Sequence, residues 1–155
     1  DPYFKEGSKN YSEQKTKGIG LLPLKTTFLE KKLTRQINSE SFWPCQSKIN
    51  GFEIHNGQTE LDNSQALLKI NPIFKDLNLG WYKENTKGGT VAGIYVHGIF
   101  ENDIWRDQYI NLIRKKKNLP ALKKKTSSYK VKRESIIENL ANEFNKHLNI
   151  SSLIN

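Results

Sequence analysis

Residues 90–103, with the sequence TVAGIYVHGIFEND, are the most informative stretch of this chain. An apolar run rich in β-branched residues predicts a buried strand, here over 90–97. The strand ends on His97, a glycine follows at once, and a helix signal begins at Asp103. This order places His97 at the tip of a strand, where open α/β sheets carry their chemistry. His97 is therefore a candidate catalytic residue, and the alternative is a hydrogen-bonded turn residue.

Working outward from this stretch, alternating or apolar runs predict four more strands. They cover residues 32–37, 49–59 with a kink at Gly51, 66–70 and 81–83. A glycine-containing turn at 85–89 joins the last of these to 90–97 as a hairpin. Two helices follow: Asp103 is a favoured N-cap for the first, which Pro120 ends. The second covers 132–148 and repeats apolar residues at helical spacing, so one of its faces is expected to be buried.

The length of 155 residues fits one domain or a large part of one, and the expected elements are mainly strands first and helices last. Residues 1–17 are polar and are expected to form a surface loop or a disordered segment, which leaves 18–155 as the domain. The net charge of +9 invites a nucleic-acid interpretation. However, the lysine runs at 115–117 and 123–125 come with no nucleic-acid motif, and a solvated basic face is favoured. No apolar run approaches the ~20 residues that a membrane span needs.

Two further segments strengthen the interpretation of His97: GLLPLKTTF at 20–28 and KINGFEIHNGQT at 48–59. Together with 90–103, and in this order, they resemble the C-terminal part of the glutamine amidotransferase domain of the cobyric acid synthases. The resemblance covers about residues 18–148. It implies the back half of a flavodoxin-like class I amidotransferase domain, with its strands first and two helices at the C-terminal end.

That family uses a Cys–His pair, and His97 is the position that matches its histidine. The family's cysteine lies in a glycine-rich turn, but no Gly-x-Cys-Gly-Gly pattern occurs in these residues. The single cysteine, Cys45, has neither a glycine-rich turn nor a helix N-terminus that would make its thiol reactive, and it is expected to be inert. The chain is therefore expected to be a fragment that lacks the catalytic cysteine and is inactive alone.

Many amidotransferases also carry a glutamate two residues after the histidine, which orients the imidazole. Here that position is Ile99, and the corrin-amidating branch of the class lacks the acid as well. Glu101 or a backbone carbonyl group is a possible substitute, although Glu101 fits the first turn of a helix equally well.

Glu53 and His55 lie two residues apart on an expected strand, so their side chains share one face. One hypothesis is that they line the glutamine pocket or a contact with the synthetase domain. The alternative is a purely structural, hydrogen-bonded strand face. No third residue with suitable spacing supports a metal site, and no metal is predicted in this chain.

The resemblance implies a glutaminase that supplies ammonia from glutamine for ATP-dependent amidation of corrin side-chain carboxylates in cobalamin biosynthesis. The implied partners are glutamine, an N-terminal ATP-dependent synthetase domain of the same polypeptide, and the corrinoid bound there. No cofactor is expected in this chain, whereas ATP and Mg are expected in the synthetase domain. The implied location is cytoplasmic, with neither nucleic acid nor membrane as a partner. The alternatives are a cobyrinic acid a,c-diamide synthase, a cell-wall precursor amidotransferase, or a non-catalytic basic binding module.

Overall fold

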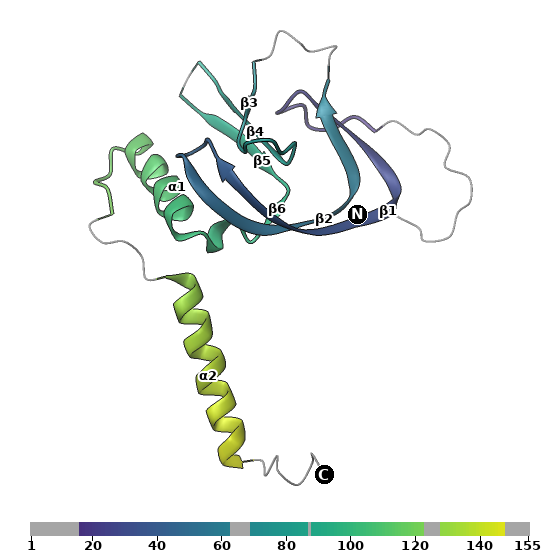
Figure 1. Ribbon diagram of the computed structural model, residues 1–155. Helices are drawn as coiled ribbons and strands as arrows, with labels where there is room; N and C mark the ends of the chain where they lie inside the picture. Colours follow the sequence, from purple (N-terminus) through teal and green to yellow (C-terminus); the bar gives the residue numbers. More distant parts are fainter. Residues whose placement is uncertain (1–15, 63–68, 87, 123–127, 148–155) are drawn as a thin grey trace.

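The computed structural model describes residues 16–62, 69–86, 88–122 and 128–147 as two small sheets followed by two helices (Figure 1). The strands form two three-stranded antiparallel sheets with the orders β1-β2-β6 and β3-β4-β5. The elements are β1 (Leu24–Ser41), β2 (Ser47–Leu61), β3 (Asn71–Pro72), β4 (Gly80–Glu84), β5 (Thr90–Ile94), β6 (Val96–His97), the 3-10 helix η2 (Ile99–Glu101), α1 (Asp103–Lys116) and α2 (Tyr129–His147). This order confirms the predicted α/β class, with strands first and helices last.

The largest element is the long hairpin of β1 and β2, which contains the strands predicted at 32–37 and 49–59. Along the first half of β2 the burial alternates from residue to residue, as expected of a strand with one covered face. Ile49, Gly51 and Glu53 are buried, whereas Phe52 and Ile54 are exposed on the other face. The two faces of β2 therefore have different surroundings.

The prediction of one continuous strand over 90–97 is wrong, because the chain changes sheets at Tyr95. β5 pairs with β4 as the predicted hairpin, whereas β6 pairs with β2. Between the two strands, the Tyr95 backbone N–H donates to the Leu79 carbonyl oxygen at 2.7 Å. This crossing ties the two sheets together directly before His97.

The strand predicted at 66–70 falls mainly on residues 63–68, which lie outside the described residues. Lys69 and Ile70 belong to no strand, and the short strand β3 begins only at Asn71.

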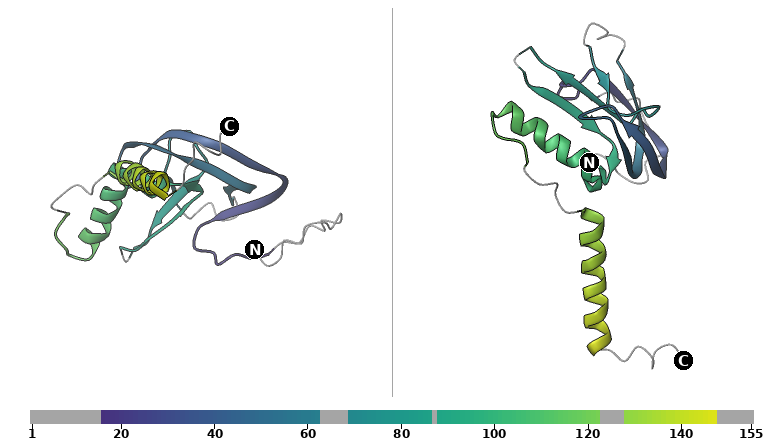
Figure 2. Two further views of the ribbon diagram at one scale, coloured as in Figure 1. Left: turned by 90° about the horizontal axis from the view of Figure 1, so that it is seen from below. Right: turned by 60° about the vertical axis from the view of Figure 1, so that its left-hand side comes forward.

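The core lies between the two sheets and α1, which runs beside them in both views of Figure 2. Its centre is Trp105, which is completely buried and donates its indole N–H to the Trp43 carbonyl oxygen at 3.0 Å. The predicted N-cap of α1 is corrected by one residue: Asn102 is the N-cap, and Asp103 lies in the first turn. The remaining buried apolar residues of this core are Ile37, Ile49, Ile73, Phe74, Leu79, Val96 and Ile99.

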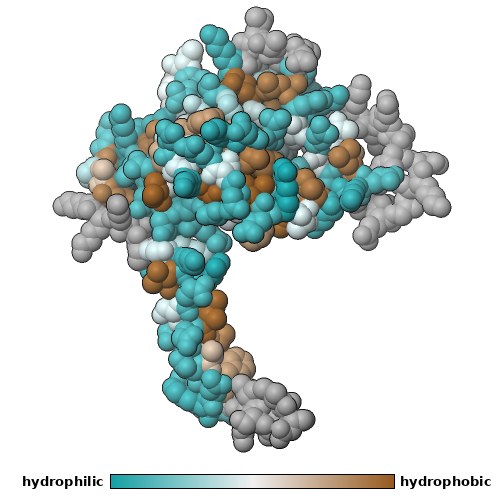
Figure 3. Space-filling model, in the orientation of Figure 1, coloured by the Kyte–Doolittle hydropathy of each residue, from teal (hydrophilic) through white to brown (hydrophobic). Residues whose placement is uncertain are grey.

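Helix α2 projects away from the sheets, and the expectation that one of its faces is buried is wrong for the described residues (Figure 1). None of its residues is buried, and its apolar side chains form an exposed strip along the helix (Figure 3). Its contacts are at its beginning, where the Tyr129 N–H donates to the Asp103 carboxylate at 3.0 Å and Arg133 lies 3.4 Å from Glu101. Among the described helices, none has the length and apolarity needed to cross a membrane.

Candidate active site

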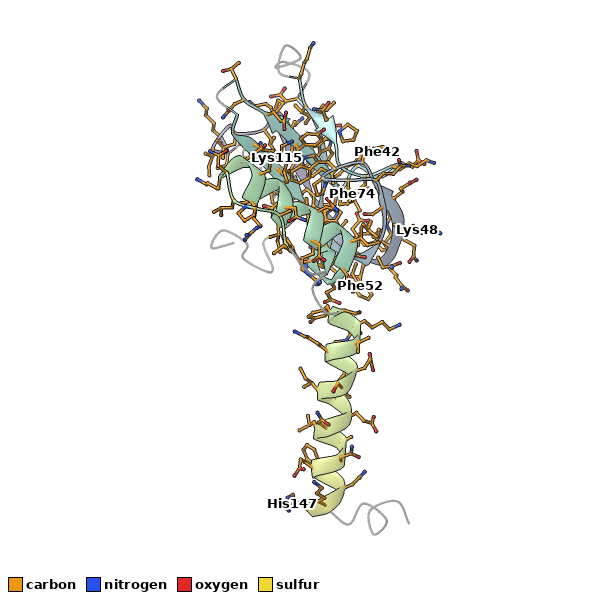
Figure 4. All side chains as sticks on the ribbon, turned by 90° about the vertical axis from the view of Figure 1, so that its left-hand side faces the viewer. Phe42, Lys48, Phe52, Phe74, Lys115 and His147 are labelled. Carbon is orange, nitrogen blue, oxygen red and sulfur yellow. The ribbon has the colours of Figure 1, made fainter. Side chains whose placement is uncertain are left out.

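His97 is the last residue of β6, and its side chain is exposed. In the antiparallel register it lies opposite Phe52, which is half exposed and labelled in Figure 4. Within the described part of the chain, the His97 imidazole has no hydrogen bond or ion pair. The ring is therefore accessible to a group that approaches this face of the sheet.

The backbone around His97 is constrained by two glycines. A Cβ atom on Gly51 would lie 2.4 Å from the His97 carbonyl oxygen and 2.6 Å from a methyl carbon of Val96, so only glycine lets β6 approach β2 this closely. Gly98 has a φ angle of 78°, in the left-handed region that glycine adopts without strain. The chain can therefore turn away from β2 immediately after His97.

The side chain of Asn102 continues the contact with β2 beyond this turn. Its Oδ1 accepts the Asn50 backbone N–H at 2.8 Å, and its Nδ2 donates to the Asn50 carbonyl oxygen at 2.9 Å. Nδ2 also lies 3.0 Å from the Ile99 carbonyl oxygen and 3.3 Å from that of Gly98. This residue was not predicted from the sequence, although an asparagine directly before a helix signal is itself an N-cap pattern.

Glu53 and His55, which were predicted to share a face, are hydrogen bonded to each other. His55 Nε2 lies 2.7 Å from Glu53 Oε1, and the Arg35 Nε–H donates to the other carboxylate oxygen at 2.5 Å. His55 Nδ1 accepts the Gly57 N–H at 3.2 Å, so an imidazole with its hydrogen on Nε2 satisfies both contacts. The His55 ring also stacks on Tyr95, with ring centroids 5.0 Å apart.

The structure does not bring this pair together with His97. Glu53 lies opposite Val96 in the ladder, whereas His97 lies opposite Phe52. Neighbouring residues of a strand point to opposite faces of the sheet. Glu53 and His97 therefore serve different faces, and the carboxylate does not orient this imidazole.

The carboxylates that follow His97 in the sequence are also engaged elsewhere. Glu101 contacts Arg133 of α2. The hydrogen bond from the Tyr129 backbone N–H is the main cause that lowers the pKa of Asp103, and Arg106 lowers it further. Neither side chain is hydrogen bonded to or ion-paired with the imidazole of His97.

Cys45 lies in the short loop between β1 and β2, is partly exposed and is not in a disulfide. The β2 segment from Ser47 to Phe52 separates this loop from the position opposite His97. That segment alone spans roughly 16 Å at the usual rise of a strand. This separation along β2 gives no support to Cys45 as the partner of His97.

A hollow of about 590 Å³ lies beside the turn, against Val96, Gly98 and Tyr129, but His97 does not line it. Throughout the described ranges, no group of three or more His, Cys, Asp or Glu residues is placed to hold a metal ion.

The family model of the CobB/CobQ-like glutamine amidotransferase domain matches residues 1–105, which include β1 to β6 and His97. Two relatives are cobyric acid synthases of Prochlorococcus marinus: that of strain MIT 9312 is 83% identical over 155 residues, and that of strain MIT 9215 is 78% identical over 154. A third, from strain NATL2A, is 42% identical over 154 residues.

The alignments cover 99–100% of this chain but only 30% of the length of each of these three relatives. A search of solved structures finds no significant match. Since the family model matches two thirds of the chain, the chain belongs to the CobB/CobQ-like glutamine amidotransferase domain family.

Proposed function

We propose that these residues are the histidine-bearing part of the glutaminase site of a cobyric acid synthase. In this proposal the site releases ammonia from glutamine for the ATP-dependent amidation of corrin side-chain carboxylates. The observation that carries the proposal is the free, exposed imidazole of His97 at the end of β6, within a family match to amidotransferase domains. The relatives that share the whole chain bear the name cobyric acid synthase.

His97 acts in this proposal as a general base and then as a general acid. It takes the proton of a cysteine thiol, whose sulfur attacks the side-chain amide carbon of glutamine to give a tetrahedral oxyanion. The imidazolium then gives the proton to the amide nitrogen, which leaves as ammonia while a thioester forms. Finally, His97 takes a proton from water, which attacks the thioester to give glutamate and the regenerated thiol.

The thiol in this scheme is supplied from outside these residues, because Cys45 is separated from His97 by several residues of β2. Its approach to the exposed face of β2, next to Phe52, would bring it to the imidazole. A sulfur-to-nitrogen distance of roughly 3 Å is needed for the proton transfer.

The proposed partners follow from the same assignment. They are glutamine, an ATP- and Mg-dependent synthetase domain of the same polypeptide, and the corrinoid substrate bound there. We propose a cytoplasmic location for such an enzyme. Glu53 and His55 remain proposed contributors to a glutamine pocket or to a domain contact, although their hydrogen bonds also suit a structural role.

The test is His97→Ala in the full-length polypeptide, assayed with glutamine and separately with high concentrations of ammonia. We expect the glutamine-dependent reaction to fall by about 10²-fold or more, since general acid–base catalysis contributes at least that factor. The ammonia-dependent reaction is expected to stay near wild type, because it does not require glutamine hydrolysis.

His147→Ala is the matched control, because His147 is also an exposed histidine but lies at the far end of α2 (Figure 4). It should leave both reactions unchanged, as should Cys45→Ser. Equal loss of the two reactions in folded His97→Ala protein would remove the glutaminase assignment of His97.

A further inference from the structure

We propose that Asn102 is a positioning residue that holds His97 in the orientation needed for proton transfer. The proposal rests on the function proposed above for His97. In it, the side-chain carboxamide of Asn102 fixes the backbone next to His97. Two observations indicate that the orientation of His97 has to be fixed through its backbone. The imidazole has no partner of its own among the described residues, and Ile99 occupies the position where other amidotransferases carry an orienting acid.

The side chain of Asn102 takes the place of the backbone partner that β2 lacks beyond His97. The ladder between β6 and β2 consists of Val96 opposite Glu53 and His97 opposite Phe52, and it stops there because the chain turns at Gly98. An unturned strand would next have met Gly51 and then Asn50. At Asn50 the side chain of Asn102 provides one donor and one acceptor instead.

The same side chain adds to the two backbone hydrogen bonds that close the turn behind His97, from the Glu101 N–H to Gly98 and from the Asn102 N–H to Ile99. Besides the Asn50 carbonyl, Nδ2 reaches the carbonyl oxygens of Ile99 at 3.0 Å and Gly98 at 3.3 Å. The segment that follows His97 is thus fastened to β2 through one carboxamide. The direction in which the His97 side chain leaves the backbone depends on this fastening, because the ladder holds His97 on one side only.

The chemistry of the site favours an amide at position 102. The Asn50 N–H needs an acceptor and the Asn50 carbonyl needs a donor, while the carbonyls of Gly98 and Ile99 take Nδ2 as a second donor beside a backbone N–H. A carboxamide supplies both, whereas an ionised carboxylate of the same shape only accepts hydrogen bonds. In Asn102→Asp, an ionised carboxylate oxygen would therefore face carbonyl oxygens. The turn would then be held less firmly to β2, although the size of the side chain is almost unchanged.

The experiment measures kcat and KM for glutamine, together with ammonia-dependent amidation, for Asn102→Ala and Asn102→Asp in the full-length polypeptide. We expect kcat with glutamine to fall about 10- to 100-fold in both variants, because a misplacement of 1 Å is sufficient to cost this much. KM for glutamine and the ammonia-dependent rate should remain within about twofold of wild type, since proton transfer is the step that suffers.

Asn38→Ala is the matched control, because Asn38 is an exposed asparagine on β1. Its side chain forms no hydrogen bond within the described residues. It should behave as wild type. The positioning role is overturned if either Asn102 variant keeps its kcat with glutamine, or loses the ammonia-dependent reaction to the same degree. A variant that does not accumulate as folded protein counts against it also, since that outcome assigns Asn102 to stability.

The His97→Ala and Asn102 variants together distinguish a failure of the positioning role from a failure of the proposed function. If His97→Ala retains glutamine-dependent turnover, the function assigned to His97 fails whatever Asn102 does. If His97→Ala abolishes that turnover while both Asn102 variants keep it, only the positioning role fails.

Discussion

Helix α2 and the segment around His97 differ in the burial of their apolar side chains. Between the sheets and α1, Val96, Ile99 and Trp105 are almost completely buried. In α2 the larger aliphatic residues and Phe144 recur at helical spacing, yet each is exposed by half or more, namely Val131, Ile136, Ile137, Leu140 and Phe144. Helical periodicity thus predicts which face of a helix can be buried. That face is buried only where another part of the protein packs against it.

The same contrast holds for polar contacts. The segment after His97 is fixed by a ladder, by the close approach at Gly51 and by the carboxamide of Asn102. Helix α2 is joined to the rest of the described chain at its first turns, through Tyr129 and Arg133. Substitutions of the buried core residues in the first region should therefore cost far more stability than substitutions along the exposed face of α2.

The largest effect is expected for Trp105→Ala, which empties the centre of the core. Removing a buried Trp side chain costs about 3–5 kcal/mol, and here the Trp43 carbonyl also loses its donor. The free energy of unfolding of the chain, from urea titration followed by far-UV circular dichroism, measures it. A loss below about 1 kcal/mol, the usual size for an average substitution, would contradict the central role of this residue.

A smaller and pH-dependent effect is expected for Asp103→Asn, at the contact between the two regions. The hydrogen bond from the Tyr129 N–H is the main cause that lowers the pKa of Asp103 from its usual 3.8. The carboxylate therefore adds stability above pH 3.8, and this contribution is lost as the pH falls below 3.8 through the lowered pKa of the folded state.

The measurement is the difference in unfolding free energy between wild type and Asp103→Asn at pH 6 and at pH 3. The wild type should be the more stable at pH 6, and the difference should shrink at pH 3. A difference that grows on acidification would show that the carboxylate is not favoured in the folded chain.

The smallest effect is expected for Phe144→Ala in α2. Its side chain is 51% exposed and lies in a helix without buried residues, so the unfolding free energy should change by no more than about 0.5 kcal/mol. The same denaturation assay compares it directly with Trp105→Ala. A loss of several kcal/mol would show that the apolar strip of α2 is covered in solution.

Local patterns in the sequence were sufficient to place most of the secondary structure. The alternation in β2, the glycine-containing turn between β4 and β5, and the start of α1 were all predicted, because each depends on residues close together in the chain. The break at Tyr95 was not predicted, since an apolar β-branched run looks the same whether it pairs with one sheet or with two. The carboxamide of Asn102 was missed for a related reason: its partner Asn50 is 52 residues away.

The sequence by itself determined that the chain is α/β, that His97 ends a strand, and that the segment around His97 resembles amidotransferase motifs. The first two features depend on residue types and on short spacings, whereas the third is a resemblance to a known family. Only the tertiary structure decided that Glu53 and His97 serve opposite faces, that Asn102 fastens the turn, and that the apolar face of α2 is left exposed. The physical reason is that register and burial are set by contacts between segments, and no local pattern specifies which segments meet.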